Sequence, residues 1–600
     1  VLSSCLIAGW YVLLADEFEV LGKHIAAGSI YISNFILQGE AGYFDTDAEL
    51  KPLLHLWSLA VEEQFYLFFP LLLMLSHKLR INALGVIVVA FAVSFAFNIS
   101  QIVDKPTEVF FFPQSRIWEL LIGSAAAYIS IQTHLLKSRT QNIANFLSLF
   151  GLALILFAWV YLDSKKIFFP YYWALLPTLG AACLILAGDK AWFNQNILAS
   201  RVAVFIGLIS YPLYLWHWVL LSFIHITEVE KLSTLLKISI LIISAVLAWL
   251  TYFLIERNIR FQKARFFSGG LLLILMLIGM TGYVVNLKQG YADRYKIDSS
   301  WTEGEIGTKS YINKGLFNQK SCLTKYKKLS RNEFFCLEQN TNKLPSALLL
   351  GDSHANQMFL SLLNRTDLTS GNLLNLGKGG CYPFINLFQQ EQCQKFMDDS
   401  LQMAVLTPSI KTVILTGYTY KPNSSSLMKK LFKLNDKTEV DLWLVFKNSV
   451  KETLYQLQSA NKNVVFVLDT PDLGFDPDAC MERPWRIDRY AEKKICAISR
   501  QKVDLYQKKY LETVRSILSE FPGVKVLDPL PAFCDQIYCW AIKDRKMLYR
   551  DRNHLNEVGA IYLGEYFHLF FFSMTMVIFF FVGWEIPKII VLLKHNYVIF

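Results

Sequence analysis

Charged side chains are scarce in this chain of 600 residues. Asp, Glu, Lys and Arg together make up 18% of it, whereas a typical soluble domain carries roughly 25%. Internal repeats, heptads and low-complexity tracts are absent, which argues against a solenoid or a coiled coil. Apolar residues reach 53% and aromatic residues 14%, so the chain is too hydrophobic to be intrinsically disordered. The modest apolar excess favours a mixture of membrane and soluble parts.

Apolar runs long enough to cross a bilayer, about 20 residues, are concentrated in the first half of the chain. Residues 1–14 resemble the end of a span, and residues 25–38 form a weaker candidate. The clear candidates are 53–76, 83–100, 117–133, 143–162, 171–188, 202–225, 234–255 and 267–287. The composition therefore predicts a multi-pass α-helical membrane bundle over residues 1–287.

Basic residues are distributed unevenly between these predicted spans. They are concentrated in every second connection, as Lys78, Arg80, Lys137, Arg139, Lys190, Arg201, Arg257, Arg260, Lys263 and Arg265. Because basic loops remain in the cytoplasm, residues from 288 onward are expected outside it. The formal charge of +10 is then partly topological in origin, and we predict membrane lipid but no nucleic acid among the partners.

The second half of the chain alternates short apolar strands with helical patterns. The predicted strands are 346–350, 412–416, 464–468 and 524–528, and the helical patterns lie near 446–460 and 499–520. This alternation predicts a parallel sheet covered by helices. We therefore expect a linker over 288–345, an α/β domain over 346–565 and an apolar tail over 566–600 with the composition of an extra span.

Cysteine usage agrees with an extracytoplasmic second half. Eight of the ten cysteines lie there, at Cys322, Cys336, Cys381, Cys393, Cys480, Cys496, Cys534 and Cys539. An even number in one such domain favours disulfides, and the spacing suggests that sequence neighbours pair. Free or metal-binding thiols are the alternative. The sequence has no C-x-x-C pair beside a histidine, which argues against zinc, and we predict no metal site.

A hydrolase-type site is predicted where the first strand of this domain ends. The strand runs directly into Gly351, Asp352 and Ser353. Ligands of open α/β sheets bind at the carboxyl ends of the strands, so Ser353 is well placed as a nucleophile. The candidate base is His554, and Asp551, three residues earlier, can orient its imidazole. The alternative is that these residues serve only turn and capping roles.

The Gly-Asp-Ser and Asp-x-x-His motifs, at the two ends of one domain, resemble those of the SGNH hydrolase superfamily over about residues 345–565. The resemblance implies an α/β/α fold with a flavodoxin-like sheet, in which Ser353 is the nucleophile, His554 the base and Asp551 its orienting group. It also implies oxyanion donors at the backbone N–H groups of Ser353 and of a glycine, for which Gly379 is a loose candidate. The family's Gly-x-Asn block is matched only by 417–419 (GYT), so the Asn donor is missing.

Ionisable residues recur inside the predicted spans, where they are costly and usually face the bundle interior. Helical spacing places His55 and Glu62 along one face. Structural alternatives exist for each group: a helix-locking ion pair, a local salt bridge or simple packing. The candidates are His55, Glu62 and Glu63 in 55–66 (HLWSLAVEEQFY), Arg116 and Glu119 in 115–123 (SRIWELLIG), and His217 in 209–217 (ISYPLYLWH).

Together with 255–257 (IER), these segments are similar in order and length to acyltransferase family 3 of the membrane-bound O-acyltransferases, over residues 1 to about 260. The fusion to an SGNH-like domain is similar to bacterial O-antigen and peptidoglycan O-acetylases. That resemblance implies transfer of an acyl group, commonly acetyl from cytosolic acetyl-CoA, to a sugar hydroxyl outside the bacterial inner membrane. Acetyl-CoA would be a substrate, and no tightly bound cofactor is expected.

One feature of that family has no counterpart in this sequence. Members begin with a span that bears a catalytic His and is followed by an Arg-rich loop, whereas this chain opens at Val1 in what resembles the third span. Neither His24 nor His55 stands at the missing position. We therefore expect an N-terminally truncated copy or fragment, or an inactive transfer half.

Three functions remain open at the level of sequence. The leading hypothesis is a membrane O-acyltransferase that moves an acyl group from a cytosolic donor to an extracytoplasmic glycan, such as lipopolysaccharide O-antigen, through an acyl-serine at Ser353. The second is a membrane-anchored glycan esterase that uses Ser353, His554 and Asp551. The third is a non-enzymatic polysaccharide carrier or pore, which predicts no dependence on Ser353.

Overall fold

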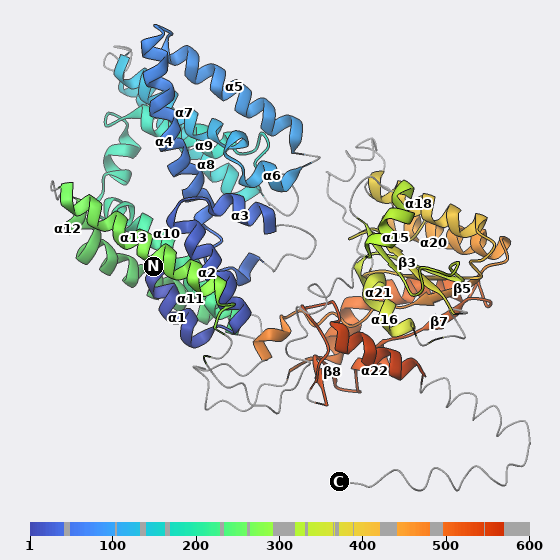
Figure 1. The fold of residues 1–600 in the computed structure, drawn as a ribbon. Helices are drawn as coiled ribbons and strands as arrows, with labels where there is room; N and C mark the ends of the chain where they lie inside the picture. Colours follow the sequence, from blue (N-terminus) through green and yellow to red (C-terminus); the bar gives the residue numbers. More distant parts are fainter. Residues whose placement is uncertain are drawn as a thin grey trace, which may run out of the picture. The chain divides into compact units, whose positions relative to one another are not determined.

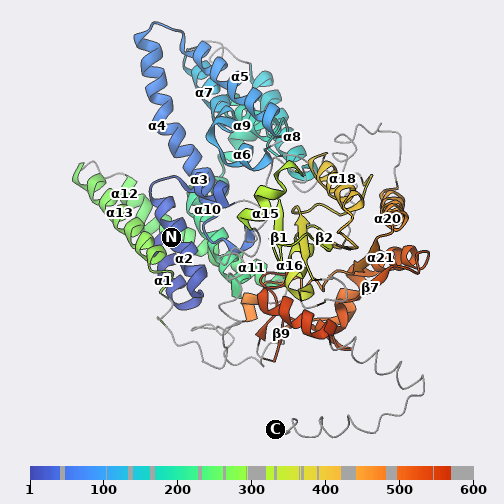
Figure 2. The same ribbon diagram turned by 45° about the vertical axis from the view of Figure 1, so that its right-hand side comes forward.

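The chain divides into two compact units, one formed essentially by residues 1–297 and the other by the residues that follow. Each unit is described separately below, and both are drawn in Figures 1 and 2. The computed structural model describes residues 1–40, 48–102, 105–132, 140–162, 169–227, 233–260, 265–291, 294, 319–329, 334–363, 365, 371–387, 389, 391–419, 441–480, 496–544 and 546–568.

The N-terminal unit consists of helices, drawn in blue to green in Figure 1. They are α1 (Leu2–Val12), α2 (Ala15–Ser29), α3 (Ser33–Glu40), α4 (Leu56–Lys78), α5 (Ala83–Gln101), α6 (Pro106–Phe111), α7 (Ile117–Gln132), α8 (Gln141–Tyr161), α9 (Leu175–Ala187), α10 (Arg201–Thr227), α11 (Thr234–Thr251), α12 (Arg257–Arg260) and α13 (Arg265–Leu287).

Six of these helical segments, within the described part of the chain, are long and apolar enough to cross a membrane. They are Leu56–Lys78, Ala83–Gln101, Gln141–Tyr161, Arg201–Thr227, Thr234–Ile259 and Gly269–Leu287. Their large apolar side chains point outward, with Met74, Val93 and Leu235 all more than 60% exposed. Such an apolar surface needs lipid around it, so the chain is a membrane protein.

The other predicted spans form shorter elements. The runs 117–133 and 171–188 become helices of 16 and 13 residues. The first begins only after a 3₁₀ turn that opens with Pro113, and the second ends at Gly188 with a φ of +68°. The weak candidate 25–38 is not one helix, because Tyr31, with a φ of +55°, separates α2 from α3.

Glycines allow two pairs of these helices to pack backbone against backbone. A Cβ atom on Gly22 of α2 would lie 2.6 Å from the carbonyl oxygen of Gly282 on α13, and the same relation holds between Gly151 of α8 and Gly180 of α9. Small residues at such crossings let membrane helices approach closely. These glycines therefore allow close packing of α2 on α13 and of α8 on α9.

The C-terminal unit is built on a six-stranded sheet of order β1-β3-β2-β4-β5-β7. All neighbouring strands are parallel except β1, which pairs with β3 in the antiparallel sense. The strands are β1 (Phe335–Glu338), β2 (Ala347–Gly351), β3 (Leu373–Gly377), β4 (Thr412–Thr416), β5 (Asn463–Val467) and β7 (Lys525–Leu527), with small pairs β6 (Ala497–Ser499)–β8 (Tyr538–Trp540) and β9 (Ile542–Lys543)–β10 (Lys546–Met547).

Both faces of the sheet are buried along β2, β3 and β4, where successive residues point to opposite sides. Leu348 and Leu350 pack on one side, against a core formed with the helices α18, α20 and α21. Leu349 packs on the other side, against a core formed with α16 and α22. The helices are α15 (Lys320–Lys325), α16 (Ser353–Leu362), α18 (Glu391–Leu406), α20 (Leu442–Ser459), α21 (Arg500–Leu518) and α22 (Leu530–Phe533). The α/β/α fold that we predicted is confirmed.

Two strands of the six-stranded sheet lie where the sequence predicted none. β1 lies inside the segment 288–345, which we predicted to be a linker, and β3 was not foreseen. The predicted apolar tail over 566–600 lies outside the described residues from 569 onward.

Four disulfides join the eight cysteines of this unit as sequence neighbours. They are Cys322–Cys336, Cys381–Cys393, Cys480–Cys496 and Cys534–Cys539. The first ties α15 to the edge strand β1. Both of its cysteines are fully buried in the core.

Replacing both Cys322 and Cys336 by serine is expected to lower the free energy of unfolding of this unit by about 3 kcal/mol, because a bond across 14 residues restricts the unfolded chain. The urea dependence of Ser353 labelling by a fluorophosphonate probe, in the full chain, measures this loss. Cys183→Ser, at a cysteine outside the disulfides, is the matched control. An unchanged urea midpoint in the double variant would show that the bond contributes little.

Candidate active site

Ser353 is the first residue of helix α16, directly after strand β2. Gly351 ends the strand with a φ of +159°, and a Cβ atom there would lie 1.9 Å from the carbonyl oxygen of Thr416, so a side chain is excluded. Asp352 caps the helix, its Oδ1 accepting the N–H of His354 at 2.8 Å. The hydroxyl of Ser353 thus stands at a helix N-terminus, beside backbone N–H groups without intrahelical partners.

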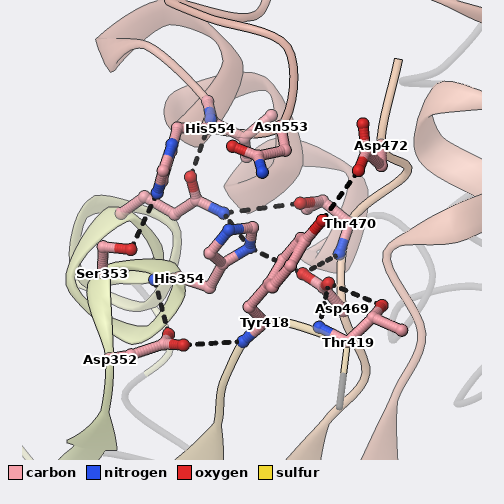
Figure 3. A network of polar contacts seen from close by, with 12 residues as sticks. Asp352, Ser353, His354, Tyr418, Thr419, Asp469, Thr470, Asp472, Asn553 and His554 are labelled. Carbon is pink, nitrogen blue, oxygen red and sulfur yellow. Dashed lines mark hydrogen bonds and ion pairs between the residues drawn. The ribbon is translucent and has the colours of Figure 1, made fainter. Parts of the chain in front are cut away.

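The structure brings the three predicted residues together, as Figure 3 shows for Ser353 and His554. The Oγ of Ser353 lies 2.7 Å from the Nε2 of His554. On the other side of the ring, Nδ1 lies 2.8 Å and 3.0 Å from the two carboxylate oxygens of Asp551. Asp551 also accepts the backbone N–H of His554 at 2.8 Å. In this geometry an imidazole can take the proton of a serine hydroxyl while a carboxylate holds its tautomer.

The pKa shifts of Asp551 and His554 favour a neutral imidazole beside an ionised carboxylate. Burial alone would raise the pKa of Asp551, but the contact with His554 and the nearby Arg550 hold it well below its usual range. Burial lowers the pKa of His554 to about 4, and the charges of His354 and Arg550 act in the same direction against the attraction of Asp551. His554 is therefore a neutral imidazole at neutral pH, with Nε2 available as a proton acceptor.

This electrostatic arrangement predicts the pH dependence of the site. The reactivity of Ser353 is expected to stay constant above about pH 4 and to fall about tenfold per pH unit below it, because protonated His554 cannot act as a base. The rate of fluorophosphonate labelling of Ser353 in the full chain, followed from about pH 3 to about pH 9, measures it. An acidic limb near 6.5, the ordinary pKa of histidine, would contradict the expectation.

The candidate oxyanion donors lie at the same edge of the sheet. Gly379 stands in the turn after β3, and β3 pairs with β2 up to Gly351. Two backbone amides of the block 417–419 already have acceptors. The N–H of Tyr418 donates to Asp352 at 3.0 Å, and the N–H of Thr419 donates to Asp469 at 2.7 Å. These two amides therefore hold the strand ends together and are not free for an oxyanion.

Sequence reasoning missed a second polar group beside the triad, visible in Figure 3. The Nδ1 of His354 lies 2.7 Å from Asp469, and the hydroxyl of Tyr418 donates to Asp472 at 2.8 Å. The positions of these residues at the ends of predicted strands could have identified them. Asp469 and Asp472 follow strand β5, as Tyr418 follows β4, and polar residues at the carboxyl ends of neighbouring parallel strands converge.

The polar residues predicted for the membrane unit form separate groups. The rings of His55 and His217 lie 6.3 Å apart, and the hydroxyl of Tyr214 bonds to the backbone carbonyl of His55 and lies 2.6 Å from the Oγ of Ser58. Both ring nitrogens of His55 are buried without a hydrogen-bond partner among the described residues.

A second group surrounds Arg116. Its guanidinium lies 3.1 Å from Glu119 and 5.2 Å from the centre of the Trp57 ring. Glu63 instead lines an open groove of about 1070 Å³ together with Gln64 and apolar side chains. For Glu62 we find no role beyond its position on α4.

Comparison with known families agrees with this architecture. Residues 5–253 match the family described as an acyltransferase domain, and residues 321–568 match the family described as an SGNH domain fused to AT3 domains. A Haemophilus influenzae protein with no assigned role is 34% identical over 185 residues, which are 29% of this chain and 74% of that protein. The chain belongs to the acyltransferase family 3 proteins that carry a fused SGNH domain.

Relatives with named activities match over shorter shares of their length. A Bacillus subtilis (strain 168) protein, provisionally named peptidoglycan O-acetyltransferase YrhL, is 28% identical over 43% of each chain. A Staphylococcus aureus (strain COL) protein, provisionally named O-acetyltransferase, is 30% identical over 36% of this chain and 37% of its own. The matches thus span less than half of these relatives.

One solved structure, the periplasmic domain of a lipopolysaccharide acetyltransferase from Salmonella ser. Paratyphi A, aligns with 45% of this chain and 95% of its own. The identity is 11% and the TM-score 0.30.

Proposed function

We propose that this chain is a membrane O-acyltransferase that moves an acyl group, acetyl in the simplest case, to a hydroxyl of an extracytoplasmic glycan. The observation that carries the proposal is the pairing of the Ser353 hydroxyl with His554 at 2.7 Å, in a chain that also has an acyltransferase membrane domain. The name of the Bacillus subtilis relative, which includes peptidoglycan, favours an acceptor from the bacterial envelope.

The chemistry proceeds in two balanced half-reactions. The Oγ of Ser353 attacks the acyl carbonyl, its proton passes to Nε2 of His554, and the leaving group departs with that proton. An acyl-serine remains. A glycan hydroxyl then attacks the ester carbonyl, gives its proton to His554, and Ser353 leaves as a hydroxyl. Transfer rather than hydrolysis requires that the glycan outcompete water at the acyl-serine.

The membrane domain supplies the acyl group in this proposal. A cytosolic acetyl-CoA would donate to it, and the domain would pass the acetyl group across the bilayer to Ser353. Two observations support an inner-membrane location with the SGNH domain on the extracytoplasmic side. Basic residues are concentrated in alternate connections between the spans, and four disulfides require an oxidising compartment.

The test uses the full chain in sealed membrane vesicles supplied with acetyl-CoA labelled in the acetyl group. Label is expected on Ser353 first and then, when envelope glycan is added on the side of the SGNH domain, on the glycan. His554→Gln should block both. Glycan labelling that persists without Ser353 would overturn the proposal.

A second candidate is a membrane-anchored glycan esterase, because the triad is complete within the C-terminal unit alone. It predicts that the full chain removes acetyl groups from glycan and turns over p-nitrophenyl acetate rapidly without acetyl-CoA. An acyltransferase predicts slow turnover in water and faster release when a glycan acceptor is present.

A further inference from the structure

A second imidazole–carboxylate pair lies beside the triad. The Nδ1 of His354 is 2.7 Å from Asp469, and both side chains are 1% exposed. Asp469 also accepts the N–H of Thr470 at 2.8 Å and both the N–H and the hydroxyl of Thr419, at 2.7 Å and 2.8 Å. These donors hold the carboxylate with its Oδ1 facing Nδ1 of His354. It therefore favours a proton on Nδ1 of His354.

This second histidine is in ring contact with the candidate base. The ring centres of His354 and His554 are 4.6 Å apart, and Tyr418 covers His354 at 4.9 Å. Gln357 connects the two segments, because its Oε1 accepts the N–H of Leu555 at 2.7 Å while its Nε2 donates to the hydroxyl of Thr470 at 3.4 Å. Figure 3 shows the two imidazoles side by side, each with a separate hydrogen-bond partner.

Two imidazoles at this distance disfavour a positive charge on both at once. The charged groups that face them decide which one is protonated. Burial opposes charge on His354, but Asp469 first, then Asp352 and Asp551, raise its pKa to about 8. The proton thus resides on His354 at neutral pH.

We propose that His354 is a positioning residue for the catalytic base. Held as an imidazolium by Asp469 and lying in ring contact with His554, it keeps His554 neutral, so that Nε2 remains free to take the proton of the Ser353 hydroxyl. This inference rests on the proposed function of the triad, and it adds a residue that acts through the base rather than on the substrate.

A positive charge on His354 affects both the basicity of His554 and the pH range over which His554 stays neutral. A neighbouring positive charge makes His554 a weaker base, which slows proton removal from Ser353. The same charge makes protonated His554 a stronger acid toward the leaving group, and it extends the active range toward acid. An extracytoplasmic enzyme whose surroundings change in pH gains from the wider range.

The experiment measures the acidic limb of Ser353 labelling by a fluorophosphonate probe in the detergent-purified full chain. In His354→Gln and in Asp469→Asn the midpoint is expected to rise by about one to two pH units, since two unit charges about 5 Å apart at an effective dielectric of about 20 interact on that scale. The double variant is expected to shift no further than His354→Gln, because the positive charge on His354 is already absent from that single variant. The charge-retaining variant His354→Lys is expected to keep the native midpoint.

Tyr418→Phe is the matched control, because it retains the ring against His354 and changes no charge beside it. Its midpoint is expected to stay in place even if its rate changes. A His354→Gln protein that labels at Ser353 with a midpoint within about 0.3 pH units of the native value would overturn the proposal. If that variant does not fold, an unshifted Asp469→Asn limb does the same. The probe needs neither acyl donor nor glycan, so a chain that labels normally but acetylates no glycan refutes only the proposed function.

Discussion

Replacing Ser353 by alanine is expected to reduce acyl transfer at least about a thousandfold, because the acyl-serine cannot form and only binding and backbone donors remain. The hydroxyl that is lost lies 2.7 Å from its base and is 1% exposed, so water cannot replace it without rearrangement. The measurement is the amount of acetyl ester on envelope glycan and the turnover of p-nitrophenyl acetate by the full chain.

Ser516→Ala supplies the control for this experiment, since Ser516 is an exposed serine on helix α21. It is expected to keep native activity. Unchanged glycan acetylation in the Ser353→Ala protein would mean that another group delivers the acyl chain and that the membrane domain acts alone.

Replacing Asp551 by asparagine is expected to lower turnover by about a hundred- to ten-thousandfold with little effect on folding. Asp551 accepts from Nδ1 and from the backbone N–H of His554. An Asn amide can instead donate to Nδ1, which puts the ring proton on Nε2 and leaves no acceptor for the hydroxyl of Ser353. The measurement is kcat with p-nitrophenyl acetate, together with the rate of Ser353 labelling.

Asp504→Asn is the matched control for that change. Asp504 forms a surface ion pair with Arg500 at 2.9 Å, with 52% of its side chain exposed, and such pairs contribute little to stability. Native rates are expected. A full rate in the Asp551→Asn protein would show that packing, rather than the carboxylate, orients His554.

The parallel core strands could be predicted because they are apolar on both faces, as in 412–416 and 464–468. The two strands that were missed contain polar residues whose partners lie far away in sequence. Asn375 in β3 donates to the carbonyl of Leu349 and accepts from Asn356. Glu338 in β1 is buried against Lys325. Each of these short apolar runs is interrupted by one polar side chain, and only the folded sheet supplies its partner.

The residues of the candidate site show the same difference between local signals and contacts that depend on the fold. Ser353 was predictable from a local turn at the end of a strand, and the Asp551–His554 pair from a spacing of three residues. The contact of His354 with Asp469 joins positions 115 residues apart, and it depends on β4 lying between β2 and β5 in the sheet. Local sequence patterns do not reveal this order of strands in the sheet.

The contact between Ser353 and His554 joins positions 201 residues apart, and this separation has a consequence for the timing of biosynthesis. At roughly 5–20 residues per second, a ribosome takes roughly 10–40 s to move from one to the other. Throughout that interval the nascent domain holds a serine without its base. Ser353 therefore gains its base only after His554 has been synthesised and the N–H of Leu555 has paired with Gln357.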